Sequence, residues 1–245
     1  TEAVKDGITV NLVYDGRAAK VMLNQDKVRQ IEEYYAQCEL EGANEHQIEE
    51  SQKAVAKMEV IIGDPDRLRA VAEDFIKHYE TRVAEGATVA GKAMFVCSNR
   101  NIAYDFYKIV KELRPEWTEK KICDDGVVLS EKDKKELKPM EKIKLVMTRN
   151  KDDEKDLFDM LGTKEDRKEF DRQFKNPKSN FKIAIVVDMW LTGFDVPELD
   201  TIYIDKPIQQ HTLIQTISRV NRVCEGKDKG LIVDYIGIKK NMNTA

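Results

Sequence analysis

Five short apolar runs, separated by longer stretches with helical spacing, constrain the fold of this chain most. They occupy residues 93–97, 143–147, 183–187, 201–204 and 230–234. Runs of this length with little polar alternation are typical of strands buried on both faces of a parallel sheet. Since strands that alternate with helices form βαβ units, the sequence predicts an α/β domain over residues 91–245, with a mainly parallel sheet and helices on both faces.

Capping signals place helices between these runs. Ser98 or Asn99 can cap one helix, and Thr163 can open another, with Asp166 at the reciprocal position of a capping box. Residues 113–139 are charged and weakly patterned. They indicate a surface loop with a short helix.

The first 90 residues have a different character. Residues 1–25 form a β-rich lead-in, in which the Asp-Gly pair at 15–16 is a strong turn signal. Residues 26–90 are charged, with apolar residues at helical spacing, and Asp64 before Pro65 suits the start of a helix. We expect a helical insertion that either packs on the main domain or contacts a partner or a neighbouring domain.

The composition excludes several classes of function. The chain has 245 residues, of which 35% are charged, and a formal net charge of −4. No apolar run approaches the roughly 20 residues that a membrane helix needs, and the first residues lack the features of a signal peptide. The acidic balance argues against a wholly basic nucleic-acid coat but is compatible with a local basic track. We therefore expect a cytoplasmic protein with no membrane partner.

The cysteines predict no metal site. The four cysteines are Cys38, Cys97, Cys123 and Cys224. They include no Cys-x-x-Cys pair and match no zinc spacing. They indicate reduced thiols in a cytosolic protein.

One predicted helix carries a glutamine and two arginines on a single face. At about 100° per residue, that face holds Gln215, Arg219 and Arg222, and an apolar face lies opposite. Arginine suits phosphate binding because its planar guanidinium stays charged and can donate two parallel hydrogen bonds. The alternative is an ordinary amphipathic surface helix.

A glycine turn that carries an acid follows the most apolar run. Thr192, Gly193 and Asp195 lie beyond the carboxyl end of the run 183–187, at the edge where open α/β sheets bind ligands. Gly193 allows a close backbone approach. Asp195 can accept a hydrogen bond from a ribose hydroxyl or pair with an arginine, and Thr192 can contact a backbone phosphate. The alternative is a structural turn with a capping aspartate.

The chain has no phosphate cradle of its own. It lacks a Gly-x-x-x-x-Gly-Lys-[Ser/Thr] segment, and it lacks an acidic strand end of the Asp-Glu-x-His kind that would hold Mg²⁺. We therefore expect that this chain cannot hydrolyse a nucleotide unaided.

Together these segments resemble the second RecA-like domain of superfamily-two helicases and translocases. Residues 187–197 resemble motif V, residues 215–222 resemble motif VI, and residues 95–100 resemble motif IV. Within that superfamily, the chain is similar to the motor (R) subunit of type I restriction enzymes in the wording of four segments, 191–197, 203–207, 213–222 and 230–235. The chain also lacks an initiator methionine, so we expect a fragment of a longer subunit.

The resemblance implies roles for the matched residues. Arg222 would be the arginine finger that reaches the γ-phosphate of ATP, Arg219 would assist it, and Gln215 would couple nucleotide state to domain closure. Gly193 and Asp195 would contact the nucleotide or the arginines. The candidates for contact with the DNA backbone are Ser98, Asn99, Arg100, Thr148 and Thr192.

The resemblance also implies a function for the whole subunit, which would translocate along duplex DNA by ATP hydrolysis and cleave it. ATP and Mg²⁺ would be held mainly by a first RecA-like domain, which, like the nuclease domain, lies outside this chain. The other implied partners are the methyltransferase and specificity subunits of a restriction complex. Two alternatives are the second motor domain of another superfamily-two helicase or translocase, and an α/β binding module without enzymatic activity.

Overall fold

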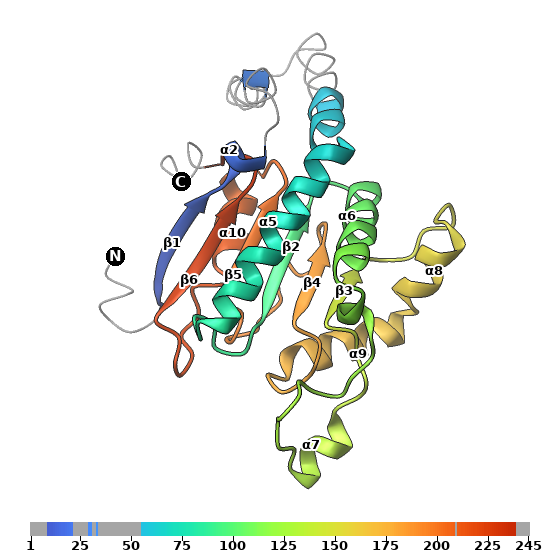
Figure 1. The fold of residues 1–245 in the computed structure, drawn as a ribbon, viewed down its shortest axis with the longest axis vertical. Coiled ribbons are helices and arrows are strands. Elements are labelled where there is room, and N and C mark those ends of the chain that lie inside the picture. The colour runs from blue at the N-terminus through green and yellow to red at the C-terminus, as the bar shows by residue number, and fades with distance from the viewer. Residues whose placement is uncertain (1–8, 22–28, 31–32, 34–54, 209, 239–245) are drawn as a thin grey trace.

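The computed structural model describes residues 9–21, 29–30, 33, 55–208 and 210–238. In this part of the chain, six strands form one parallel sheet with the order β1-β6-β5-β2-β4-β3 (Figure 1). The strands are β1 (Asn11–Gly16), β2 (Ala93–Cys97), β3 (Ile143–Val146), β4 (Ile183–Val186), β5 (Thr201–Asp205) and β6 (Lys229–Asp234). Every apolar run that predicted a strand therefore forms one.

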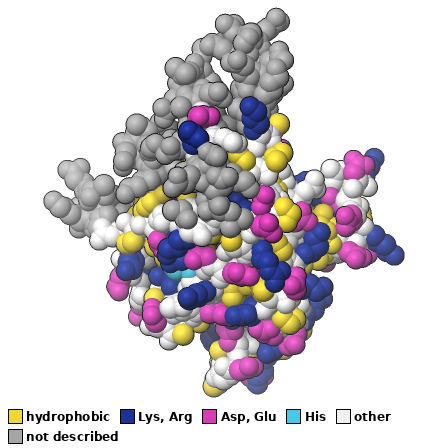
Figure 2. Space-filling view, turned by 45° about the horizontal axis from the view of Figure 1, so that its top comes forward, with side chains coloured by type: hydrophobic (Ala, Val, Ile, Leu, Met, Phe, Trp, Pro, Cys, Tyr) yellow, Lys and Arg dark blue, Asp and Glu magenta, His cyan; other side chains and the backbone are white. Residues whose placement is uncertain are grey.

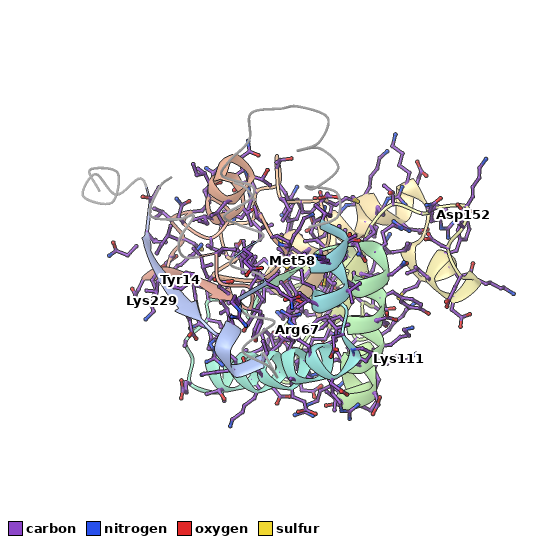
Figure 3. The ribbon with its side chains drawn as sticks, turned by 90° about the horizontal axis from the view of Figure 1, so that it is seen from above. Tyr14, Met58, Arg67, Lys111, Asp152 and Lys229 are labelled. Carbon is purple, nitrogen blue, oxygen red and sulfur yellow. The ribbon has the colours of Figure 1, made fainter. Side chains whose placement is uncertain are left out.

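Helices cover both faces of the sheet (Figure 1, Figure 3). α5 (Pro65–Ala84) and α6 (Arg100–Leu113) lie on one face, and α9 (Lys164–Lys175) and α10 (Gln210–Ile217) lie on the other. The strands β2 to β5 are buried along their whole length, which explains their continuous apolar sequence. The shorter helical elements are α2 (Ala18–Val21), residues 55–62, η1 (Pro115–Thr118), α7 (Glu131–Glu136) and α8 (Lys155–Leu161).

The helix α5 begins where the sequence predicted. The Asp64 side chain caps it by accepting a hydrogen bond from the Arg67 amide (3.0 Å). Its apolar stripe packs on the sheet, where the Phe75 ring lies edge-on to that of Tyr203, with 4.7 Å between centroids. α5 therefore packs on the main domain, as in the first of the two alternatives for residues 26–90. The helices expected within residues 34–54 lie outside the described residues.

Arg67 also ties α5 to the sheet from inside the protein. It forms an ion pair with Asp205 at the end of β5, and both side chains are only 1% exposed. Its guanidinium donates further hydrogen bonds to the carbonyls of Ile62 (3.1 Å) and Tyr235 (3.2 Å). Figure 3 shows Arg67 between α5 and the sheet. A charge this deeply buried is tolerated because several partners compensate for its lost hydration.

The turn predicted at residues 15–16 is wrong. Asp15 and Gly16 are the last two residues of β1, and Gly16 lies opposite Asp234 of β6. The parallel pairing with β6 requires an extended backbone, and this tertiary contact overrides the local turn signal. The β-rich lead-in thus contributes an edge strand to the main sheet.

The stretch 113–139 is a surface arm with two short helical elements, η1 and α7, in line with the prediction of a loop with a short helix. An antiparallel bridge between Lys121 and Met140 joins its two ends. An ion pair of 2.6 Å between Asp133 and Lys178 ties α7 to the chain beyond α9. In Figure 1, α7 projects beyond the amino ends of the strands.

The described surface mixes charges of both signs. Figure 2 shows Lys and Arg side chains interspersed with Asp and Glu over the face turned to the viewer. Among the described helices, none is long and apolar enough to cross a membrane.

Candidate functional site

The loop after β4 is anchored by aromatic side chains and leaves its polar residues exposed. The Trp190 and Phe194 rings stack with centroids 4.1 Å apart. Both rings pack near Phe174 of α9, at 5.2 and 6.0 Å. Gly193 and Asp195 are exposed, and Gly193 has a φ of +68° with no heavy atom near the position of an added Cβ. This glycine is therefore required by the backbone turn, since its surroundings would accommodate a side chain.

The helix α10 ends at Ile217, so the prediction of one helix face carrying Gln215, Arg219 and Arg222 is wrong. Beyond Ile217 the backbone tightens, and the Arg219 amide donates to the carbonyl three residues before it (3.1 Å). The Gln215 carbonyl, which loses its helical partner, accepts instead from the Ser218 hydroxyl (2.7 Å) and from Arg219 Nε (3.2 Å).

A close contact with β6 accompanies the end of this helix. Val220 is fully buried, and its carbonyl lies directly against Gly230. A Cβ added at Gly230 would be 2.3 Å from the Val220 oxygen. Only a glycine allows this approach of the turn to the strand.

The next two residues pair with the chain just before β1. The Val10 amide donates to the Asn221 carbonyl (2.8 Å), and Thr9 and Arg222 form an antiparallel bridge. Arg222 therefore lies on bridged backbone beside the edge strand, outside the helix that its spacing suggested.

Both arginines still reach the loop after β4. The Arg219 guanidinium donates to the Phe194 carbonyl, and Arg222 Nε lies 3.5 Å from an Asp195 carboxylate oxygen. Burial and the nearby charge of Arg222 lower the pKa of Arg219, which Asp195 partly offsets. Arg222 and Asp195 are 52% and 59% exposed, so a ligand can reach the Arg222 guanidinium. Four of the predicted site residues are thus brought together: Gly193, Asp195, Arg219 and Arg222.

The predicted DNA contacts lie at the carboxyl ends of β2, β3 and β4. The Ser98 hydroxyl donates to the Asp205 carbonyl (3.0 Å), and the Asn99 side chain caps α6 by accepting from its third residue (3.0 Å). Thr148 and Thr192 are exposed. The two threonines therefore present their hydroxyls to solvent at this edge of the sheet, while Ser98 and Asn99 also serve the fold.

Arg100 has protein partners that the sequence did not indicate. Its guanidinium donates to the Thr148 carbonyl (2.7 Å) and forms a two-point contact with the Asp153 carboxylate, each at 2.5 Å. Its positive charge is thus already paired. Asp153 could not be foreseen, since it lies in a loop more than 50 residues away with no motif around it.

Three other residues that shape the site were also missed. Thr9 and Val10 hold residues 218–222, the arginine segment, by backbone contacts, which leave no trace in side-chain chemistry. Gly230 did carry a signal, because a glycine inside a strand suggests the close approach of another backbone segment.

The arginine pair fits a phosphate better than a metal ion. Its exposed guanidinium offers donors of fixed geometry to anionic oxygens. Within the described residues, no group of three or more His, Cys, Asp and Glu side chains could hold a metal ion.

Comparison with known proteins identifies the family. Residues 89–237, more than half of the chain, match the model for domain 3 of the type I restriction enzyme subunit R. This chain belongs to the R-subunit family of type I restriction enzymes. The match contains the loop after β4 and the arginine segment, as the resemblance of their motifs predicted.

Relatives of the R-subunit family align with the whole chain. The HindI endonuclease subunit of Haemophilus influenzae is 36% identical over 247 residues, which is 100% of this chain and 21% of that protein. A Methanocaldococcus jannaschii sequence assigned as the MjaIXP endonuclease subunit is 36% identical over 244 residues, which is 99% of this chain and 20% of that protein. The chain thus spans about a fifth of the length of these relatives.

A solved structure supports the fold. A fragment assigned to an HsdR subunit of a type I restriction enzyme from Vibrio vulnificus YJ016 superposes with a TM-score of 0.53 at 11% identity, covering 98% of this chain and 35% of that structure. With the all-parallel sheet and its helices on both faces, it confirms the predicted RecA-like α/β fold class.

Proposed function

We propose that this chain completes the ATP site and contacts the duplex DNA backbone in an R subunit that translocates DNA by ATP hydrolysis and cleaves it. The observation that carries the proposal is the pairing of the motif V loop with the arginine segment. The Arg219 guanidinium donates to the Phe194 carbonyl, and Arg222 Nε lies 3.5 Å from an Asp195 carboxylate oxygen. These contacts join the two segments and leave the Arg222 guanidinium accessible.

In this proposal Arg222 is the arginine finger. ATP with Mg²⁺, held mainly by a first RecA-like domain outside this chain, supplies the phosphoryl group whose transfer to water drives the motor. Arg222 turns from Asp195 toward that group and stabilises the negative charge that develops on it. Arg219 holds the arginine segment against the motif V loop by its hydrogen bond to the Phe194 carbonyl. Gln215 lies one helical turn before Arg219 and couples nucleotide state to closure of the two domains.

The exposed carboxyl edge of the sheet is the proposed DNA surface. Thr148 and Thr192 offer hydroxyls to phosphates, and Ser98 and Asn99 lie beside them. Arg100 joins the track by exchanging the Asp153 carboxylate for a phosphate. Contacts of this kind go to the backbone, so binding should tolerate any sequence and weaken with salt. In the cytoplasm, methyltransferase and specificity subunits would supply recognition of the DNA site.

The test is DNA-stimulated ATP hydrolysis by a full-length subunit that carries this sequence, with Arg222→Ala compared with the wild type. We expect kcat to fall by about 10³ to 10⁵, the range that an arginine finger contributes, with ATP still bound. Arg172→Ala, a change at a 65% exposed arginine on α9, is the matched control and should leave turnover unchanged. Undiminished turnover in Arg222→Ala would contradict the proposed role.

The chain by itself should show no measurable ATP hydrolysis, because it has no phosphate cradle. A phosphate-release assay on the purified 245-residue chain, with and without DNA, checks this expectation. Turnover that disappears in Arg222→Ala would show that the chain holds the nucleotide unaided, contrary to the proposal.

Family membership argues against one alternative, and the turnover assay tests the other. A match to the R-subunit model over residues 89–237 argues against another superfamily-two motor. An α/β binding module would keep full turnover in both Arg219→Ala and Arg222→Ala, which the same assay measures.

A further inference from the structure

We propose that Thr9, Val10 and Gly230 are positioning residues that set the reach of Arg222, so that the chain entering β1 controls the arginine finger. This inference rests on the function proposed above.

The first support is that α10 does not carry Arg222. α10 ends at Ile217, and the Ser218 amide makes its last i to i−4 hydrogen bond, to the Ile214 carbonyl (3.0 Å). Its hydrogen bonds reach as far as Val220. The last turn donates to carbonyls three residues back, at Arg219 and Val220 (both 3.1 Å). The position of Arg222 must therefore be set by other contacts.

Two elements supply those contacts from different sides. Gly230 of β6 leaves room for the Val220 carbonyl, 2.3 Å from the position of an added Cβ. The chain before β1 adds the Val10–Asn221 hydrogen bond (2.8 Å) and the bridge between Thr9 and Arg222. The arginine segment is thus joined to the chain just before β1 by one hydrogen bond and one isolated bridge.

This arrangement lets the chain just before β1 influence the position of Arg222. A shift of the backbone at Thr9 would move Arg222, its bridge partner, and a shift at Val10 would move Asn221, which accepts its hydrogen bond. Catalysis by a positioned charge is sensitive to such shifts, since a displacement of about 1 Å can cost on the order of 100-fold in rate.

Two substitutions in a full-length subunit test the proposal from the two sides. Val10→Pro removes the amide that donates to Asn221, at a position before the strand where proline is tolerated. Gly230→Ala pushes the Val220 carbonyl away. Val13→Ala, at a 39% exposed side chain of β1, and Gly16→Ala, whose Cβ would meet the Tyr14 ring at 3.1 Å, are the matched controls.

We expect kcat for DNA-stimulated ATP hydrolysis to fall about 10- to 100-fold in Val10→Pro and in Gly230→Ala, and to stay near the wild-type value in both controls. Combined with Arg222→Ala, neither change should lower kcat further, because both act through Arg222. Hydrogen exchange provides a readout independent of turnover. Peptides covering residues 218–224 should exchange faster in both variants than in the wild type, while those covering β2 and β4 should not.

Three results would overturn the proposal. They are unchanged exchange at residues 218–224, faster exchange with undiminished kcat, and a loss of kcat that persists in the Arg222→Ala background. Undiminished turnover in Arg222→Ala alone is a separate failure. It would refute the finger role itself and with it the control of the finger, while exchange would still report whether Val10 holds the segment.

Discussion

His78 is a partly buried histidine whose surroundings favour the neutral ring. Its Nδ1 lies 2.8 Å from the Tyr203 hydroxyl, and its side chain is 12% exposed. Burial lowers its pKa from 6.5 to about 4, helped by the charges of Arg17 and Arg82 and opposed by Asp15 and Asp74. The unfolded chain therefore binds a proton here between pH 6.5 and about 4, while the folded chain does not.

This difference makes stability depend on pH. The free energy of unfolding should fall as the pH drops from 6.5 toward 4, by about 1.4 kcal/mol per pH unit from His78. In His78→Gln, whose amide can still meet Tyr203, the loss between pH 7.5 and 5 should be smaller by about 2 kcal/mol. Urea unfolding at both pH values measures it, and equal losses in the two proteins would exclude this role of His78.

At the residue scale, the sequence predicted which residues form the candidate site better than it predicted the backbone structure that places them. Arg219 and Arg222 do meet the loop that carries Gly193 and Asp195, through the Phe194 carbonyl and the Asp195 carboxylate. The accessibility of Arg100 was predicted less well. Its place just after a strand indicates an accessible positive charge, but that charge is paired with Asp153. Long-range ion pairs of this kind have no local signature.

Among the elements, α9 shows how a glycine and a cap act together. Thr163 and Asp166 form the predicted capping box at its start. Gly162, just before it, has a φ of +64°, and an added Cβ would be 2.7 Å from the Asp166 Cβ. The glycine thus permits both the turn and the cap.

Gly162→Ala should therefore destabilise the protein more than Gly86→Ala. Gly86 has a similar φ of +67° but no heavy atom within 4 Å of an added Cβ, so its change adds only backbone strain of about 1 kcal/mol. The clash at Gly162 also disturbs the capping box, which should lower the free energy of unfolding by about 1 kcal/mol more. Thermal unfolding of the two variants compares them, and equal shifts in Tm would mean that the cap is unaffected.

The elements that the sequence predicted well are those set by burial. The strands β2 to β5 are covered on both faces, so their composition alone identifies them. The edge strand β1 has exposed Leu12 and Val13, and the sequence predicted only that this stretch is β-rich. Its pairing with β6 carries the strand through the turn-like Asp15 and Gly16. The end of α10 depends likewise on Gly230 and Thr9, which are distant in sequence, so helical spacing extended it five residues too far, to Arg222.

At the scale of the whole molecule, the pair of Arg67 and Asp205 joins the helical layer to the sheet. Asp205→Asn leaves the Arg67 charge buried without its partner and should cost about 3–5 kcal/mol. The double change Arg67→Leu with Asp205→Leu should cost less than the single one, because it removes both charges. Glu112→Gln, which breaks an exposed pair with Arg69, is the control and should change stability by less than about 1 kcal/mol. Urea unfolding distinguishes these cases, and a neutral Asp205→Asn would contradict this role.

The neighbouring places of β1 and β6 also govern how the protein can form during synthesis. Tyr14 of β1 hydrogen-bonds to Asp234, 220 positions later, so the ribosome releases the first strand long before its partner exists. Until then β1 exposes both hydrogen-bonding edges, and the segment of Arg222 lacks the bridge that holds it. Long-range pairing of this kind is slow to form. The emergence of β6 therefore completes both this sheet and the arginine site.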